Sequence, residues 1–128
     1  MNMGISVSIN DGSRYRIEAK AYCMGNDLIV LVGGGTHPHA GAFTVHRAAI
    51  TAEQNMSVCF PGHRDDIVAQ KFLSVLSELW DGTVIVIAGI HVDQATQEDI
   101  RLLLSASDEC LDQLTRKLDV LNRTENQI

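Results

Sequence analysis

The chain has 128 residues, of which 45% are hydrophobic and 20% are charged, and its formal net charge is −6. This length and composition predict one globular domain, spanning residues 1–128, with one core. The ten Lys and Arg residues are spread thinly, which argues against nucleic acid or an anionic membrane surface as a partner, because both bind clustered cations.

Five strands are predicted in the first half of the chain. Residues 4–10 and 14–22 alternate apolar and polar side chains around an Asp-Gly-Ser turn, which is typical of a hairpin. Residues 27–32, DLIVLV, are almost continuously apolar and predict a central strand covered on both faces. Residues 40–50 and 55–60 predict a fourth and a fifth strand.

The second half predicts two helices around a sixth strand. In residues 65–80 the apolar side chains recur every three to four positions, at Val68, Phe72, Val75, Leu76 and Leu79. Residues 81–92 contain the β-branched run TVIVIAGI and predict a strand. Leucines keep helical spacing over residues 96–122, and Thr96 with Asp99 forms a capping pair.

This order of elements, β-β-β-β-β-α-β-α, predicts an α+β fold. We expect a single, mostly antiparallel sheet of about six strands, with one or two long helices packed on it and room for one parallel crossover. The last helix would be roughly 40 Å long, which exceeds the span of so small a domain. We therefore expect part of its leucine stripe to pack against another subunit in a homodimer or higher oligomer.

The lack of a recognisable targeting signal and the use of cysteine predict a cytoplasmic protein. The first ten residues lack a basic region followed by a long apolar one, and the longest apolar stretch is about half of what a membrane helix needs. The three cysteines, Cys23, Cys59 and Cys110, are an odd number without a pairing motif, which favours reduced thiols. We expect each of them to be a small core residue.

Glycine and histidine follow an apolar strand at three separate places. His37 and His39 follow LIVLVGGG, His63 follows SVCFPG, and His91 follows VIVIAG. Glycine allows close approach to the backbone, and its N–H groups, like those at a helix N-terminus, bind anions. If the three loops meet at one edge of the sheet, they form a site for a phosphorylated small molecule. The candidate binding residues are Gly33, Gly34, Gly35, Thr36, His37, His39, Gly62, His63, Arg64, His91 and Asp93.

Other interpretations of these residues stay open. Each glycine stretch alone is also typical of a plain turn. His37 and His39 form an H-x-H pair that, with His63 or His91, would give zinc three nitrogen ligands, although Pro38 between them argues for a loop. No serine lies in the context of a nucleophile, and no catalytic residue is predicted. Cys59 and His63 suggest a thiol–imidazole pair, but Cys59 in its strand is more simply a core residue.

Three motifs together, GGTHPHAGA, PGHRDD and AGIHVDQATQEDI, resemble those of the small LpdD-like proteins. This family accompanies UbiD-type decarboxylases, which use prenylated FMN to add or remove carboxyl groups on aromatic acids. Its members are regarded as chaperones that bind prenylated flavin, and their fold is likened to that of bacterial relatives of proteasome-assembly chaperones. The resemblance covers roughly residues 4–118.

The resemblance implies prenylated FMN, or FMN, as the ligand. The phosphate would lie at the glycines 33–35 and at the turn 61–64, and the histidines would contact the phosphate, the ribityl hydroxyls or the ring. The chain has few aromatic residues, so ring contacts would come from aliphatic side chains or a second subunit. The favoured function is non-catalytic binding and delivery or maturation of the cofactor for a UbiD-type decarboxylase. A metal-dependent enzyme and a protein-interaction accessory subunit of a decarboxylase are the alternatives.

Overall fold

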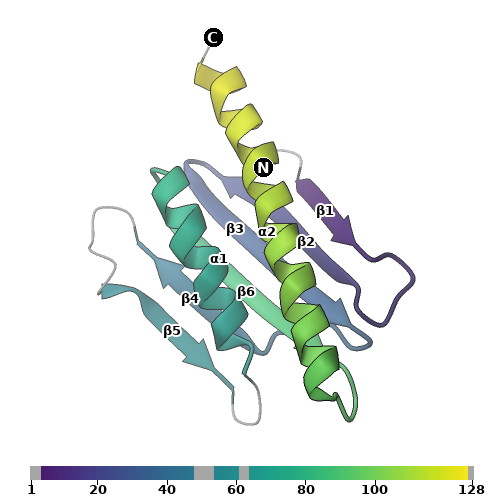
Figure 1. Ribbon diagram of the computed structural model, residues 1–128. Helices are drawn as coiled ribbons and strands as arrows, with labels where there is room; N and C mark the ends of the chain where they lie inside the picture. The colour runs from purple at the N-terminus through teal and green to yellow at the C-terminus, as the bar shows by residue number, and fades with distance from the viewer. Residues whose placement is uncertain (1–3, 48–53, 61–63, 127–128) are drawn as a thin grey trace.

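The computed structural model describes residues 4–47, 54–60 and 64–126. Within these residues the chain forms one sheet with two helices on the same face (Figure 1). In chain order the elements are β1 (Ile5–Ile9), β2 (Ile17–Met24), β3 (Asp27–Gly35), β4 (Ala42–His46), β5 (Met56–Cys59), α1 (Asp66–Leu79), β6 (Val84–His91) and α2 (Gln97–Asn126). The predicted α+β fold and the predicted order of elements are confirmed.

The sheet has the strand order β1-β2-β3-β6-β4-β5. β3 and β6 pair in parallel, and the other neighbouring strands pair antiparallel. Because β4 is antiparallel to both β5 and β6, those two strands run in the same direction and α1 connects them across β4. The carboxyl ends of β3, β5 and β6 therefore lie at one edge of the sheet.

The core lies between the sheet and the two helices. Alternate residues of the central strands face it, and Val30 and Val86 are completely buried there. From α1, Phe72 and Leu76 pack into this layer, and α2 adds Leu114. The burial of these apolar side chains is the main source of stability for the fold.

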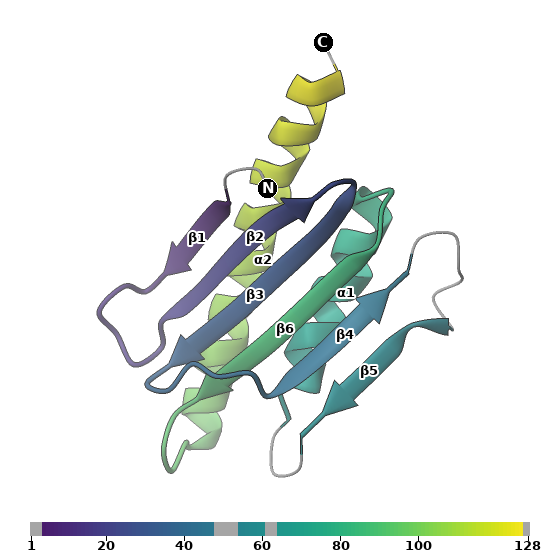
Figure 2. The same ribbon diagram turned by 180° about the vertical axis from the view of Figure 1, so that it is seen from behind.

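The opposite face of the sheet carries no helix in the described part of the chain (Figure 2). The prediction that the strand starting at Asp27 is covered on both faces is wrong, because Leu31 on this face is 40% exposed. Phe43 in β4 is 37% exposed on the same face. The continuous apolar run arises because the uncovered face is itself apolar. We call this surface the open face.

The helices match their predicted spans, but the burial of their apolar side chains differs from the prediction in two ways. In α1, Val75 and Leu79 are exposed, because Ala69 and Leu73 complete the buried stripe instead. In α2, part of the leucine stripe was expected to pack against another subunit, but Leu111 and Leu118 of this stripe are buried against this chain's own sheet. The carboxyl end of α2 extends past the sheet (Figure 1). Across the described residues, neither helix combines the length and apolar character of a membrane span.

Candidate functional site

The ends of β3 and β6 bring two of the three predicted loops together. Gly35 lies opposite His91 in the parallel pair, and the amides of Thr36 and His37 donate to the His91 carbonyl oxygen at 2.8 and 3.3 Å. We call this edge, residues 35–41 and 91–93, the rim. Parallel neighbours end at the same edge, so the sequence signal of strand, glycine and histidine has a structural basis here.

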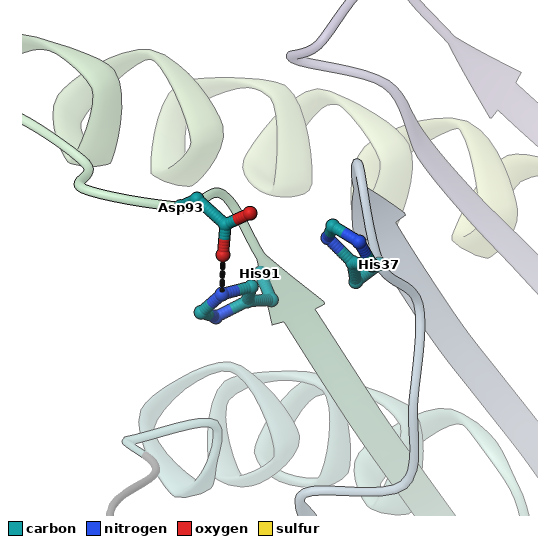
Figure 3. Close-up of side chains that lie close together, drawn as sticks. All are labelled: His37, His91 and Asp93. Atoms are coloured by element: carbon teal, nitrogen blue, oxygen red, sulfur yellow. Dashed lines mark hydrogen bonds and ion pairs between the residues drawn. The ribbon is translucent and has the colours of Figure 1, made fainter.

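Three polar side chains gather at the rim (Figure 3). The Nε2 atom of His91 lies 2.8 Å from a carboxylate oxygen of Asp93, and the rings of His37 and His91 have centroids 5.8 Å apart. The hydrogen bond from His91 holds the pKa of Asp93 below its usual range, and His37 acts in the same direction. Asp93 is therefore a carboxylate at neutral pH.

His39 is held at the rim by groups of the protein itself. Its Nδ1 atom donates to the carbonyl oxygen of His37 at 3.0 Å, and its Nε2 atom lies 3.2 Å from a carboxylate oxygen of Asp65. Asp65 is buried, and its other oxygen accepts from the amide of Ile90 at 2.9 Å. Asp65 thus links the start of α1 to β6 and to the loop after β3.

The sequence pattern of Asp65 indicated only a charge at a helix N-terminus. In the structure it is the residue before α1, and its side chain makes no capping hydrogen bond to that helix. Burial of an aspartate depends on contacts from distant parts of the chain, which periodicity does not reveal. An acidic residue next to a Gly-His turn and before a helix is the only signal that the sequence offers.

The three consecutive glycines do not form the loop that was expected. Gly33, Gly34 and Gly35 are the last residues of β3. A Cβ atom at Gly34 would collide with the Arg16 carbonyl oxygen, and one at Gly35, whose φ is 72°, would collide with that of His91. The Gly35 amide donates to the Arg16 carbonyl oxygen at 2.8 Å. With the Thr36 and His37 amides also bonded to backbone, these N–H groups do not form the expected anion-binding nest.

Of the third predicted loop, the structure describes only Arg64. Gly62 and His63 lie outside the described residues, so the structure does not place them. Arg64 is described, and its Nε atom lies 3.4 Å from a carboxylate oxygen of Asp66. Arg64 and His91 both line a pocket of about 220 Å³ between α1, β6 and α2. This pocket places Arg64 next to His91, while the rest of the third loop is outside the described residues.

A larger pocket lies on the open face beside the rim, with a volume of about 360 Å³. Two predicted site residues, Gly33 and His39, line it. Its charged side chains are Arg16, Glu18 and Lys20, none of which the motifs pointed to. The antiparallel pairing of β2 with β3 places them there, because residues two apart in a strand share a face.

His46 and the cysteines are not part of the cluster at the rim. His46 contacts Asn55 at 2.6 Å through its Nδ1 atom and lines a separate pocket of about 480 Å³ between β4, β5 and α1. Cys110 is buried in the core as expected, and burial raises its pKa to about 11. The expectation of a core position is wrong for Cys59, which is exposed on the edge strand β5.

Comparisons with known proteins agree with the resemblance of the motifs. The family model described as "Prenylated flavin chaperone LpdD-like domain" matches residues 11–119. The chain is 30% identical to the Protein LpdD of Lactiplantibacillus plantarum over 100 residues, which are 74% of this chain and 71% of that protein.

A similar solved structure is described as "Crystal Structure of a Novel Chaperone Complex for Yeast 20S Proteasome Assembly". The alignment has a TM-score of 0.56 and 13% identity, and it covers 91% of this chain and 99% of that one. At this level of identity the likeness concerns the fold alone.

Proposed function

Because the chain belongs to the LpdD-like prenylated flavin chaperone family, and so has a chaperone or accessory role, we propose that it binds prenylated FMN and delivers it to a UbiD-type decarboxylase. In this role the protein protects and transfers a cofactor and catalyses no reaction on a substrate. The cofactor has a dianionic phosphate, a polar ribityl chain and a broad apolar ring system. A binding site for it needs cations beside an apolar surface.

The pocket on the open face carries this proposal. Its volume of about 360 Å³ falls in the range of roughly 300–1,000 Å³ typical of small-molecule sites. Leu31, Ile87 and Pro38 give it apolar walls, and Arg16 and Lys20 lie on one side of it. The phosphate would lie between these two cations, because arginine binds phosphate oxygens through paired N–H groups. The ring would pack on the aliphatic side chains.

Glu18 allows a specific test of this proposal. Its carboxylate contacts the Arg16 guanidinium, and its second oxygen lies 3.6 Å from the Lys20 ammonium group. A bound phosphate would compete with this carboxylate for both cations and would be repelled by it. Arg16 and Glu18 therefore have opposite expected effects on affinity, although they are neighbours in one pocket.

Binding of the cofactor tests the site. We expect Arg16→Gln to weaken binding of FMN or prenylated FMN by about 10- to 100-fold, the value of one hydrogen bond between charged groups, and Glu18→Gln to strengthen it. Arg116→Gln is the matched control, because this arginine is on α2 and pairs with Asp112. The affinity is measured by fluorescence or visible absorbance titration, for the prenylated cofactor without oxygen. Equal affinities of all variants would contradict the proposed site.

Delivery needs a separate measurement. The protein is loaded with prenylated FMN, separated from free cofactor, and mixed with a decarboxylase that lacks it. We expect the decarboxylase to gain activity faster from the loaded chaperone than from the same amount of free cofactor. Activation at the same rate from both sources would contradict delivery while leaving cofactor binding intact.

We also propose that two copies of the chain associate through the open face. Leu31 and Phe43 expose apolar surface there, and half-buried aliphatic side chains of β3 and β6 surround them. Exposed apolar patches of this kind mark interaction sites. A second copy would cover the flavin pocket and supply the ring contacts that the few aromatic residues of one chain do not provide.

A further inference from the structure

The cluster of His37, His91 and Asp93 at the rim takes no part in the proposed flavin pocket. One potential ligand atom from each of these side chains lies within 4.8 Å of the other two. Figure 3 shows His37 on the chain after β3 facing His91 and Asp93 at the end of β6. Two ligands of one tetrahedral zinc ion are about 3.4 Å apart. All three side chains are exposed, so rotation about their side-chain bonds can bring the atoms to that distance.

We propose that His37, His91 and Asp93 bind a divalent transition metal ion of the kind that prefers imidazole ligands, such as Zn²⁺ or Co²⁺. Two imidazoles and one carboxylate are a common ligand set for these ions. The sequence suggested His37 and His39 together with His63 or His91, and the set with His91 differs from the present one in a single ligand. Both ring nitrogens of His39 already face oxygen atoms of the protein, and Asp93 takes its place.

Hydrogen bonds around His37 prepare it for this role. The Thr36 hydroxyl lies 2.9 Å from the Nδ1 atom of His37 and 3.3 Å from the carbonyl oxygen of His91. A carbonyl oxygen only accepts, so the hydroxyl proton goes to His91 and the Nδ1–H group of His37 donates to the hydroxyl. This arrangement leaves the Nε2 lone pair of neutral His37 available to a metal ion. Ligating histidines in metal sites usually donate their second N–H in this way.

The contact between His91 and Asp93 also fits a metal site. In the metal-free protein the Nε2–H group of His91 donates to the carboxylate oxygen at 2.8 Å. A metal ion on Nε2 would take the place of this proton, which would move to Nδ1 of a neutral ring or, from an imidazolium, to the solvent, and the negative charge of Asp93 would stay beside a positive one. Proton release on binding is general for sites with histidine ligands. The exposure of all three side chains leaves the other coordination positions open to water or to an added anion.

Titration of the untagged protein with the metal alone tests this proposal. We expect one Zn²⁺ to bind per chain by calorimetry, and Co²⁺ to give visible absorption bands. His91→Ala and Asp93→Asn should each weaken binding by at least about tenfold, and Thr36→Val, which removes the partner of His37, by about 10- to 100-fold. His46→Ala is the matched control, because His46 contacts Asn55 and is not part of the cluster.

The result does not depend on flavin, because no cofactor is added. Circular dichroism of the metal-free variants checks that they fold, and two different ligand variants are used so that one misfolded protein does not decide the outcome. Absence of Zn²⁺ binding at micromolar concentrations, or equal binding by the wild type, His91→Ala and Asp93→Asn, would overturn the proposal. The Arg16 and Glu18 variants should bind Zn²⁺ normally, which separates failure of this site from failure of the flavin pocket.

Discussion

Gly35 and Gly12 both have positive φ angles, of 72° and 79°, but their surroundings differ. A Cβ atom at Gly35 would collide with the His91 carbonyl oxygen, whereas one at Gly12 would meet nothing within 4 Å. We expect Gly12→Ala to lower the free energy of unfolding by about 1 kcal/mol, the cost of the left-handed conformation. Gly35→Ala should lower the free energy of unfolding by clearly more, because the paired backbone must also move. Urea denaturation measures both values, and equal losses would contradict the close approach at the rim.

The residues of the rim show what the sequence can and cannot predict at this scale. The convergence of His37 and His91 follows from two strand ends with the same local pattern, and the structure brings these side chains together. The contacts of Asp65 with Ile90 and His39, by contrast, join segments far apart in the chain. Motif spacing carries no information about such contacts. The expectation that the glycines form a loop was wrong for the same reason, since Gly33, Gly34 and Gly35 end β3 and their close neighbours come from other parts of the chain.

At the scale of elements, the start of α2 is fixed by Asp99. Its carboxylate accepts from the Tyr15 hydroxyl at 2.6 Å and from the Thr96 amide at 3.0 Å, and Arg14 lies 3.3 Å away. The amide of Asp99 in turn donates to the Thr96 hydroxyl at 3.0 Å, which completes the capping box. These contacts join α2 to the connection between β1 and β2.

The same contacts predict a dependence of stability on pH. The hydrogen bond from Tyr15, followed by that from the Thr96 amide, lowers the pKa of Asp99 in the folded protein. A lowered pKa stabilises the fold above the unfolded value of about 4, and this contribution is lost as the pH falls. We expect Asp99→Asn to lower the urea midpoint at pH 7 and to lower it much less at pH 3.

Glu98→Gln is the control for this experiment. The pKa of Glu98 is also lowered, by its hydrogen bond with Arg101, but this ion pair lies on the surface. Surface ion pairs contribute little to stability, so its urea midpoint should stay close to the wild-type value at both pH values. Equal effects of the two substitutions on the urea midpoint would show that the contacts of Asp99 contribute no more to stability than the surface ion pair of Glu98.

The order and type of the elements were predictable because periodicity reports which residues share a face. Strand β3 shows what periodicity does not predict. Its apolar run is compatible with a second layer of helices and with an apolar open face, and only the positions of α1 and α2 distinguish the two (Figure 2). Similarly, the leucine stripe of α2 predicted a covered face without identifying what covers it. The structure shows that β1 and β2 lie under it.

At the scale of the whole molecule, the open face and the exposed apolar residues of α2, such as Val120, make different predictions for self-association. If the open face joins two copies, Leu31→Lys should give a monomer in multi-angle light scattering, because a charge would be buried at the interface. Val120→Lys, at a 65% exposed position on α2, should leave the dimer intact. The opposite pattern would place the interface on α2, and a monomeric wild type at micromolar concentration would contradict self-association.

The pairing of β3 with β6 also determines when the rim can form during synthesis. Leu28 pairs with Val84, so β4, β5 and α1 must all be made before the central strand gains its parallel neighbour. Pairing of distant segments is slow because a long loop must close first. His37 leaves the ribosome long before His91, and until β6 is made it lacks its neighbours His91 and Asp93. A nascent or truncated chain that ends before Val84 therefore lacks the rim cluster, and any ligand of that cluster can stabilise only the chain whose sheet is complete.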